Sequence, residues 1–559
     1  MIPDNIIMKV SSNRPFPVLM IFLFTVGWSL IVNGQDTLLT VAEASGYTST
    51  STHDEVRSFI AGLERSSQYI RSELLAVSAE GREIPLAVIG NPLPAGPEDL
   101  ANDDRMVVYI QANIHAGEVE GKEASLMLMR DLLRAPDSAI FKKLVLLVVP
   151  NLNADGNDKI SPEHRSYQNG PVNGVGLRRN GQYLDLNRDA MKLESPEMRG
   201  VVTRVLNRWD PAVTVDCHTT NGSYHEEPIT FTWMMNPNGN RDLINYMRDV
   251  MMPDVHRTLF EKYNVENVFY GEFIDRMQME KGWMSYASEP RYMVNYIGVR
   301  NRLAILNENY VYAAYETRVK GCYHLLQTIL EYVSDNREEI RKMLDEADGR
   351  LPGRDYAPGI PDSFAIEYEG RPTPEKVTIK AFEADTIPGA RGYWRYIKTD
   401  RKRTVTVDYI ADYYPVKSIP VPYAYLLTVP AKEVVANLRD HGIIMEELAE
   451  AKQLEVESFR IDELKGSRRL NQGHYTNSVK GEYEIEQMGF PAGTLIIRTN
   501  QPLGNLVSGL LEPQADDSML KWNFFDRYLV PQWGGGYYPY PVYRLMEKED
   551  LELHPFLNF

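Results

Sequence analysis

Two apolar segments of this chain, far apart in the sequence, each end in a polar stretch that contains a histidine. Residues 106–110 (MVVYI) run into residues 113–118 (NIHAGE), and residues 212–215 (AVTV) run into residues 216–218 (DCH). The first polar stretch precedes residues 124–129, which have helical composition, so it lies where a strand ends and a helix begins. This pattern favours an α/β fold with polar side chains at the carboxyl ends of neighbouring strands.

The histidines and one glutamate of these stretches predict a metal site. His115 and Glu118 are three residues apart in a turn that enters a helix, so both side chains can face one point in space. Neutral imidazole and carboxylate both suit Zn²⁺ at about 2.0 to 2.2 Å. A third ligand has to come from a distant strand end, and His218 supplies one. We therefore predict that His115, Glu118 and His218 hold one zinc ion per chain.

A His-x-x-Glu pair alone is a weak signal, but further motifs accompany it in a fixed order. They are N-x-x-x-D-G at 151–156, R-x-N at 178–180, D-L-N-R at 185–188, D-x-H at 216–218 and a glutamate closing the apolar strand at 303–308. Across residues 45 to 335 this order resembles the zinc carboxypeptidases of the M14 (carboxypeptidase A) family. The resemblance says little about the rest of the chain.

The resemblance implies a role for each of these polar residues, with water as the fourth zinc ligand. Glu308 matches the general base that deprotonates this water and then protonates the leaving amine. Arg178 matches the arginine that stabilises the oxyanion. Asn187 and Arg188 match the pair that binds the terminal carboxylate of the substrate, and Asp185 matches the carboxylate that orients the first zinc histidine.

Structural alternatives exist for these residues. Arg178 and Arg179 could form a solvated pair, or Arg179 could be the one that points inward. Asn187 and Arg188 could cap the helix suggested by residues 195–197, and Glu308 could pair with a nearby arginine, Arg300 or Arg302. The family also has a mobile tyrosine over the substrate, for which Tyr286, Tyr292 and Tyr296 are equal candidates. The remaining histidines of interest are expected on loop or helix surfaces: His164, His225 and His256.

The N-terminal segment is typical of a secretory signal peptide. Lys9 and Arg14 precede fifteen uncharged residues, 18–32, and a small residue, Gly34, follows. We expect residues 1–34 to be removed and the protein to be secreted or periplasmic, with no stable membrane span; an uncleaved tether is the alternative. The net charge of −17 disfavours nucleic acid as a partner. The two cysteines, Cys217 and Cys322, predict no disulfide framework, and Cys217 is expected to be a small buried residue.

Strands and helices alternate to about residue 335, which predicts a mixed-sheet α/β sandwich over residues 35–335. Residues 336–359 are expected to be a linker, since glycines and prolines gather at 349–361. A small β-rich module over 360–430 and an α+β region over 431–559 follow, and residues 480–512 are expected to return to β structure. Aromatic residues between 522 and 540 could form a stacking surface or fold back on a domain interface.

Together these features predict an exported zinc metallocarboxypeptidase that hydrolyses a peptide bond next to a free C-terminal carboxylate. Its expected partners are the C-termini of peptides or proteins, with cell-wall peptides as a further class. One alternative is a cell-wall peptide amidase or carboxypeptidase on the same scaffold. Another is a catalytically silent peptide-binding module, which would lack a ligand, the arginine or the base.

Overall fold

The structure is a computed structural model that describes residues 38–286, 288–354, 356, 362–389, 394–429 and 431–556. The predicted signal peptide, residues 1–34, lies outside the described residues. From residue 39 onward the chain forms one compact unit. Among the described helices, none combines the length and the apolar character that a membrane crossing requires.

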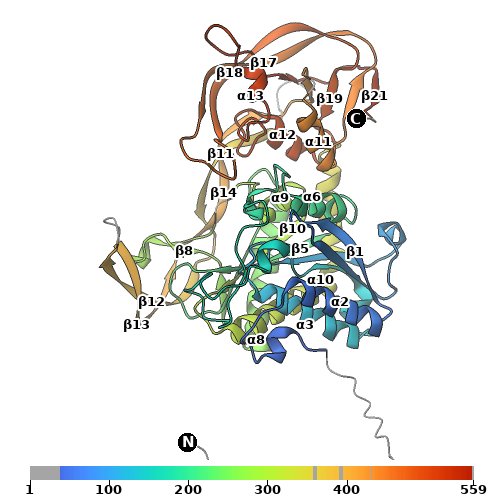
Figure 1. Cartoon of the computed structure of the whole chain (residues 1–559). Helices are drawn as coiled ribbons and strands as arrows, with labels where there is room; N and C mark the ends of the chain where they lie inside the picture. The colour runs from blue at the N-terminus through green and yellow to red at the C-terminus, as the bar shows by residue number, and fades with distance from the viewer. Residues whose placement is uncertain are drawn as a thin grey trace, which may run out of the picture. The chain divides into compact units, whose positions relative to one another are not determined.

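An eight-stranded mixed sheet forms the centre of the first half of the chain, as predicted (Figure 1). Its strands in spatial order are β1 (Ile70–Val77), β2 (Glu83–Ile89), β4 (Leu144–Val149), β3 (Met106–Ala112), β5 (Val213–Thr220), β10 (Leu303–Tyr310), β6 (Ile229–Trp233) and β7 (Asn267–Phe269). Strands β4, β3, β5 and β10 are parallel to one another. Every residue of β4 is buried, which explains its unbroken apolar sequence, because parallel strands are covered on both faces.

Helices cover both faces of this sheet (Figure 1). One face carries α2 (His53–Ser66), α3 (Glu120–Arg134), α8 (Met252–Tyr263) and α10 (Tyr315–Arg350), and the other carries α6 (Pro196–Gly200) and α9 (Met293–Val299). Helix α2 begins at a capping box in which Thr52 and Glu55 satisfy each other's backbone donors. Shorter helical elements are α1 (Val41–Ala44), α4 (Ala139–Lys143), α5 (Ala154–Asn157), η2 (Leu186–Arg188), η3 (Val201–Leu206), α7 (Arg241–Tyr246) and η4 (Met247–Met251).

The second half of the chain contributes three further sheets. A four-stranded sheet contains β11 (Ser363–Pro372), β14 (Tyr409–Pro420), β9 (Trp283–Met284) and β8 (Glu272–Phe273), and a separate hairpin joins β12 (Val377–Pro388) to β13 (Trp394–Val407). A seven-stranded sheet contains β18 (Asn477–Phe490), β17 (Lys452–Gly466), β20 (Val542–Leu545), β15 (Ala424–Leu427), β19 (Leu495–Arg498), β16 (Glu446–Leu448) and β21 (Leu553–Pro555). Its helices are α11 (Lys432–Asp440), α12 (Gly504–Leu511) and α13 (Asp526–Leu529).

Strand pairing crosses the predicted domain boundaries. Strand β14 pairs with β9, which belongs to the first half of the chain, and β15 pairs with β19 and β20. The first fifteen residues of the predicted linker, 336–350, continue helix α10, which bends at Asn336. The division into domains at these boundaries therefore stays a prediction.

One local expectation was wrong in part. Residues 480–512 are not β structure throughout, because α12 occupies Gly504–Leu511 with almost every side chain buried.

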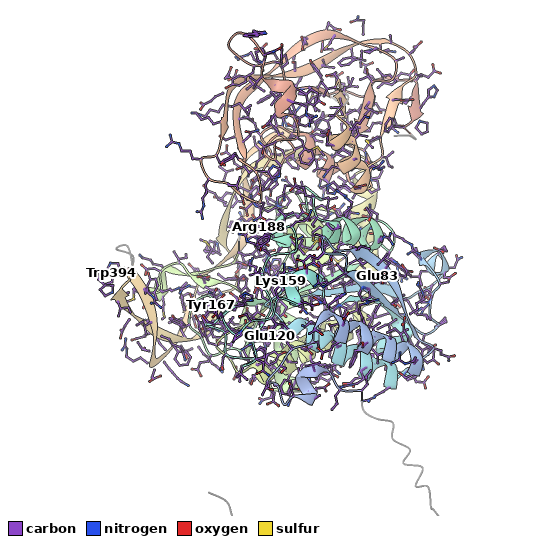
Figure 2. All side chains as sticks on the ribbon, viewed as in Figure 1. Glu83, Glu120, Lys159, Tyr167, Arg188 and Trp394 are labelled. Atoms are coloured by element: carbon purple, nitrogen blue, oxygen red, sulfur yellow. The ribbon has the colours of Figure 1, made fainter. Side chains whose placement is uncertain are left out.

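The aromatic residues near the C-terminus do not share one environment. Trp522 and Tyr540 are buried, whereas Trp533 is exposed, as is Trp394 on β13 (Figure 2).

Candidate active site

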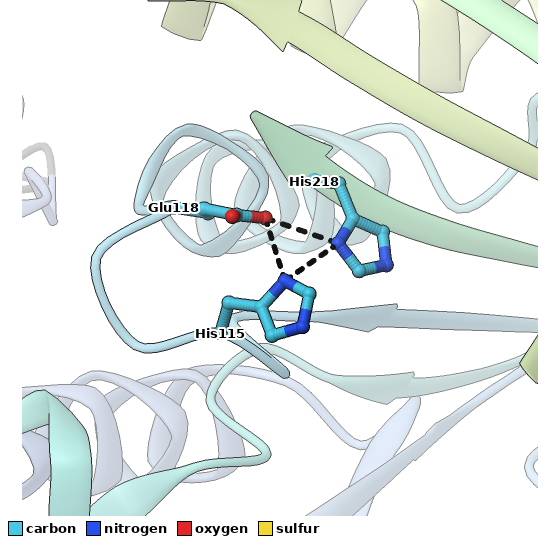
Figure 3. A group of neighbouring side chains, drawn as sticks. All are labelled: His115, Glu118 and His218. Carbon is cyan, nitrogen blue, oxygen red and sulfur yellow. Dashed lines mark hydrogen bonds and ion pairs between the residues drawn. The ribbon is translucent and has the colours of Figure 1, made fainter. Parts of the chain in front are cut away.

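The structure brings the three predicted metal ligands together (Figure 3). The Nδ1 atoms of His115 and His218 lie 3.2 Å apart, and Oε2 of Glu118 lies 3.1 Å from the first and 3.0 Å from the second. All three side chains are buried. Each offers one ligand atom, and these atoms lie within 4.8 Å of one another, which is the spacing that a single metal ion requires.

The end of strand β3 explains how His115 and Glu118 reach this point. The strand stops at Ala112, and Asn113 adopts a left-handed backbone conformation with φ of 60°, which asparagine tolerates better than most residues. The Asn113 side chain donates to Asn151 Oδ1 at 2.7 Å, so the turn is fixed from the neighbouring strand end. The Glu118 amide then donates to the His115 carbonyl at 2.9 Å, which closes the turn before α3 begins.

Two aspartates fix the orientation of the imidazole rings. His115 Nε2 lies 2.9 Å from Asp185 Oδ1, and His218 Nε2 lies 2.9 Å from Asp216 Oδ2. In a neutral imidazole whose Nε2–H donates to a carboxylate, Nδ1 carries no proton and presents a lone pair. The two Nδ1 lone pairs that face each other here repel unless a cation lies between them. Two neutral imidazole nitrogens and one carboxylate oxygen are a donor set that fits zinc.

Two arginines surround the carboxylate of Glu118. Arg165 Nη1 lies 2.9 Å and Arg178 Nη1 lies 3.2 Å from Oε1, the oxygen that faces away from the two histidines. Burial alone would raise the pKa of Glu118, but the neighbouring His115 and Arg165 hold it well below its usual range. The carboxylate is therefore ionised and available to a metal ion.

Arg178 points into the site, while Arg179 does not. Arg178 also bonds Asp185 through Nε, at 3.0 Å from Oδ2, and its side chain is 40% exposed toward the pocket. Arg179 is exposed and donates to the carbonyl of Tyr183. Of the alternatives left open by the sequence, the structure selects Arg178.

Glu308 lies beside the ligands on strand β10 and lines the same pocket. Burial raises the pKa of its carboxyl to about 8, although the neighbouring His218 acts in the opposite direction. Arg300 binds Asn207 and the carbonyl of His441, and Arg302 binds two other carboxylates, Asp210 and Asp348. The alternative in which Glu308 pairs with Arg300 or Arg302 is therefore not what the structure shows.

These side chains line a pocket of about 280 Å³. Arg188 faces it and stacks on the ring of Tyr292, with 4.3 Å between the guanidinium carbon and the ring centroid. Asn187 accepts from the Met293 amide at 2.9 Å. Ser195, rather than Asn187 or Arg188, caps helix α6. The pocket is lined by His115, Glu118, Arg165, Tyr167, Arg178, Asn187, Arg188, Thr219, Thr220, Asn221, Tyr270, Glu272, Tyr286, Tyr292, Val294, Leu306 and Glu308.

Among the three tyrosines left open by the sequence, the structure separates one from the others. Tyr286 and Tyr292 line the pocket, and their rings meet edge to face at 5.9 Å. Tyr296 is fully buried on helix α9, where its hydroxyl lies 2.7 Å from His441 Nδ1. Tyr296 is therefore structural, and the two pocket tyrosines remain candidates to cover a substrate.

Sequence reasoning missed two charged residues of this site and misplaced one histidine. Asp216 is two residues before His218 on a strand, so the period of two that puts both on one face was a usable signal. Arg165 lies in a loop and crosses Gly117, where a Cβ would come within 2.6 Å of its Cδ; no local pattern indicates this contact. His225 is buried and stacks on Tyr310 at 3.8 Å, so the expected surface position was wrong.

Known proteins resemble this chain in the same region. The family model for zinc carboxypeptidase, peptidase M14, matches residues 56–224. Carboxypeptidase 2 of Trichophyton rubrum is 21% identical over 533 residues, covering 89% of this chain and 87% of that protein. A metallo-carboxypeptidase from Pseudomonas aeruginosa, solved in complex with (2-guanidinoethylmercapto)succinic acid, is 18% identical, covering 52% of this chain and 70% of its own, with a TM-score of 0.38. The carboxypeptidase A from Helicoverpa armigera is 14% identical, covering 52% and 75%, with a TM-score of 0.37.

The matched residues include all three proposed metal ligands, His115, Glu118 and His218. The chain carries a domain of the zinc carboxypeptidase family, peptidase M14.

Proposed function

We propose that this chain is an exported zinc metallocarboxypeptidase that hydrolyses the peptide bond next to a free C-terminal carboxylate, with one zinc ion per chain. The observation that carries the proposal is the meeting of the three ligand atoms at the edge of a pocket that His115, Glu118, Glu308 and Arg188 line. The export rests on the charge and apolar pattern of residues 1–34 and predicts a secreted or periplasmic protein.

Glu308 is the proposed general base. His115, Glu118 and His218 would hold the zinc ion, which would supply a coordinated water of lowered pKa and polarisation of the scissile carbonyl. Glu308 takes a proton from the attacking water and returns it to the leaving amine, so that one carboxylate serves both proton transfers. Burial raises the pKa of this carboxyl, and the positive charge of a bound zinc ion would act in the opposite direction and favour the ionised form that a base requires.

Two arginines and an asparagine are the proposed binding groups for the negative charges of the substrate. Arg188 offers a guanidinium fork to the terminal carboxylate, and the ring of Tyr292 beneath it limits its motion. Asn187 adds an amide to the same wall of the pocket. Arg178, half exposed toward the pocket, stabilises the oxyanion that forms when water attacks the carbonyl, and such a donor contributes about 3 to 4 kcal/mol.

The pocket has some apolar lining beside its more extensive polar lining. Tyr270, Tyr286, Val294 and Leu306 supply the apolar lining. Three carboxylates also line the pocket, and each already has a role or a partner. Glu118 is a proposed metal ligand, Glu308 is the proposed base and Glu272 is paired with Arg276. A peptide ending in phenylalanine and the same peptide ending in lysine therefore distinguish an apolar from a basic preference.

The test combines metal analysis with a peptide assay. Purified protein is treated with a chelator, assayed, and assayed again after Zn²⁺ or Mg²⁺ is added. The substrates are one peptide ending in Phe, the same peptide ending in Lys, its C-terminal amide and a D-amino-acid variant. We expect zinc to restore release of Phe and the amide to be a poor substrate. Turnover of the amide at an equal rate would contradict the carboxypeptidase assignment, and preference for the D-residue would point to cell-wall peptides.

A further inference from the structure

A loop of the C-terminal region reaches the metal site. Residues 467–476 connect β17 to β18, and the side-chain oxygen of Gln472 accepts a hydrogen bond from the Asp185 amide at 2.8 Å. The loop has a defined shape, because Asn471 and His474 exchange backbone hydrogen bonds of 2.8 and 2.9 Å around Gln472 and Gly473, which both have positive φ. Asp185 is the carboxylate that orients His115, so the loop contacts the site through a single intermediate residue.

The same segment, residues 185–194, is bound by the C-terminal region at further points. His474 Nε2 lies 2.7 Å from Glu194 Oε1, and the Asn437 side chain donates to the carbonyls of Met191 and Lys192 at 3.1 and 2.7 Å. This segment carries Asn187 and Arg188, the proposed carboxylate-binding pair. Its position is therefore set from outside the domain that holds the zinc ligands.

A second contact fixes the opposite wall of the pocket. Asp517 is fully buried, accepts from the Arg291 amide at 3.0 Å and lies 3.1 Å from the Arg291 guanidinium. Arg291 directly precedes Tyr292, the residue on which Arg188 stacks. Because two bonds hold Arg291, the ring of Tyr292 has little freedom to leave Arg188.

We propose that two residues of the C-terminal region hold groups of the active site in position. Gln472 is a positioning residue for Asp185 and hence for His115, and Asp517 is a positioning residue for Tyr292 and hence for Arg188. The first half of the inference concerns metal retention and stands without a substrate. The second half rests on the proposed function, because it assigns Arg188 to a substrate carboxylate.

The first test compares Gln472→Met, which keeps the side-chain length but removes the acceptor, with Leu470→Ala in the same loop, where the side chain is 57% exposed. The readouts are the rate of zinc loss to a chelator and amide hydrogen exchange of residues 185–194. We expect roughly tenfold faster metal loss and faster exchange for Gln472→Met alone. Wild-type values for both readouts in that variant would overturn the role of Gln472.

The second test compares Asp517→Asn with Asp550→Asn at an exposed position. We expect Asp517→Asn to raise KM for a peptide with a free carboxylate by about tenfold, with a smaller change in kcat. Should Asp517→Asn fail to fold, Arg291→Lys keeps the charge and the backbone bond to Asp517, loses the guanidinium contact and is expected to raise KM in the same direction. Unchanged KM in a folded variant would overturn the role of Asp517. If wild-type protein cleaves no C-terminal peptide, the proposed function fails, while metal loss and exchange still decide the role of Gln472.

Discussion

Glu308 lies directly opposite His218 in the parallel pairing of β10 with β5. Paired residues of adjacent parallel strands project to the same face of a sheet, so the register alone places the carboxylate beside a metal ligand. Neither strand could slip by one residue without moving one of the two side chains to the other face. The relation between the proposed base and the metal is thus built into the sheet rather than into a mobile loop.

Replacing Glu308 by glutamine is expected to lower kcat by about 10² to 10⁴, since the amide cannot take the proton of the attacking water. Zinc should remain bound, because the ligands are unchanged, and metal content measured on the purified variant checks this. Glu272→Gln is the matched control, because Glu272 is a carboxylate of the same pocket that is paired with Arg276. Equal rates for Glu308→Gln and wild type would remove Glu308 from the mechanism.

Asp216→Asn is expected to weaken zinc affinity by about 10- to 100-fold, because a neutral amide makes the His218 ring a poorer donor to the metal. The measurement is a competition titration against a chelator of known affinity. Cys217→Ala is the control: it alters the same strand on the face toward helix α3, where Gly121 lies. A Cys217 effect as large as that of Asp216 would indicate general loosening of β5 instead.

Arg188→Met should raise KM by roughly 30-fold for a peptide with a free carboxylate, which corresponds to about 2 kcal/mol for a lost charged hydrogen bond. The amidated peptide should be affected far less, since it has no carboxylate for Arg188 to bind. Arg179→Met, at the exposed neighbouring arginine outside the pocket, should behave as wild type. Steady-state kinetics with the two peptides separate these cases, and an equal loss on both would argue against carboxylate recognition.

Glu197 gives a prediction about stability and pH. Its side chain is fully buried, and this burial raises its pKa from 4.5 to about 7. The folded state therefore holds this proton more tightly than the unfolded state, so the free energy of unfolding falls as pH rises from 4.5 to 7, by up to about 3 kcal/mol. Glu197→Gln should flatten this fall in urea titrations of metal-free protein, while Glu163→Gln at an exposed site should not. A parallel fall in both variants would assign the pH dependence to other groups.

Local patterns in the sequence were sufficient to predict the centre of the site. His115 and Glu118 share one turn, and the apolar runs before His218 and Glu308 mark strands that end beside it. The mixed sheet was confirmed for the same reason, because hydrophobic runs of strand length alternate with helical segments. Each of these signals depends on residues close together in the chain.

What the sequence did not indicate depends on contacts between distant residues. The bonds of Arg165 to Glu118 and of Gln472 to Asp185 join loops that no periodicity describes. The helical state of Gly504–Leu511 was missed because a short, largely apolar segment suits a buried helix and a buried strand equally. Tyr296 could not be distinguished from Tyr286 and Tyr292 because all three lie in one segment, and burial alone separates them.

The order of residues along the chain determines when each part of this site, up to the bond between Gln472 and Asp185, can form during synthesis. The ribosome releases the histidine and glutamate of the first turn long before strand β10, and β10 long before the loop that follows β17. A growing or truncated chain therefore has the proposed metal ligands before it has the proposed base, and both before the loop that contacts Asp185. Completion of the pocket coincides with completion of nearly the whole polypeptide, so a fragment released early would be an unfinished protease.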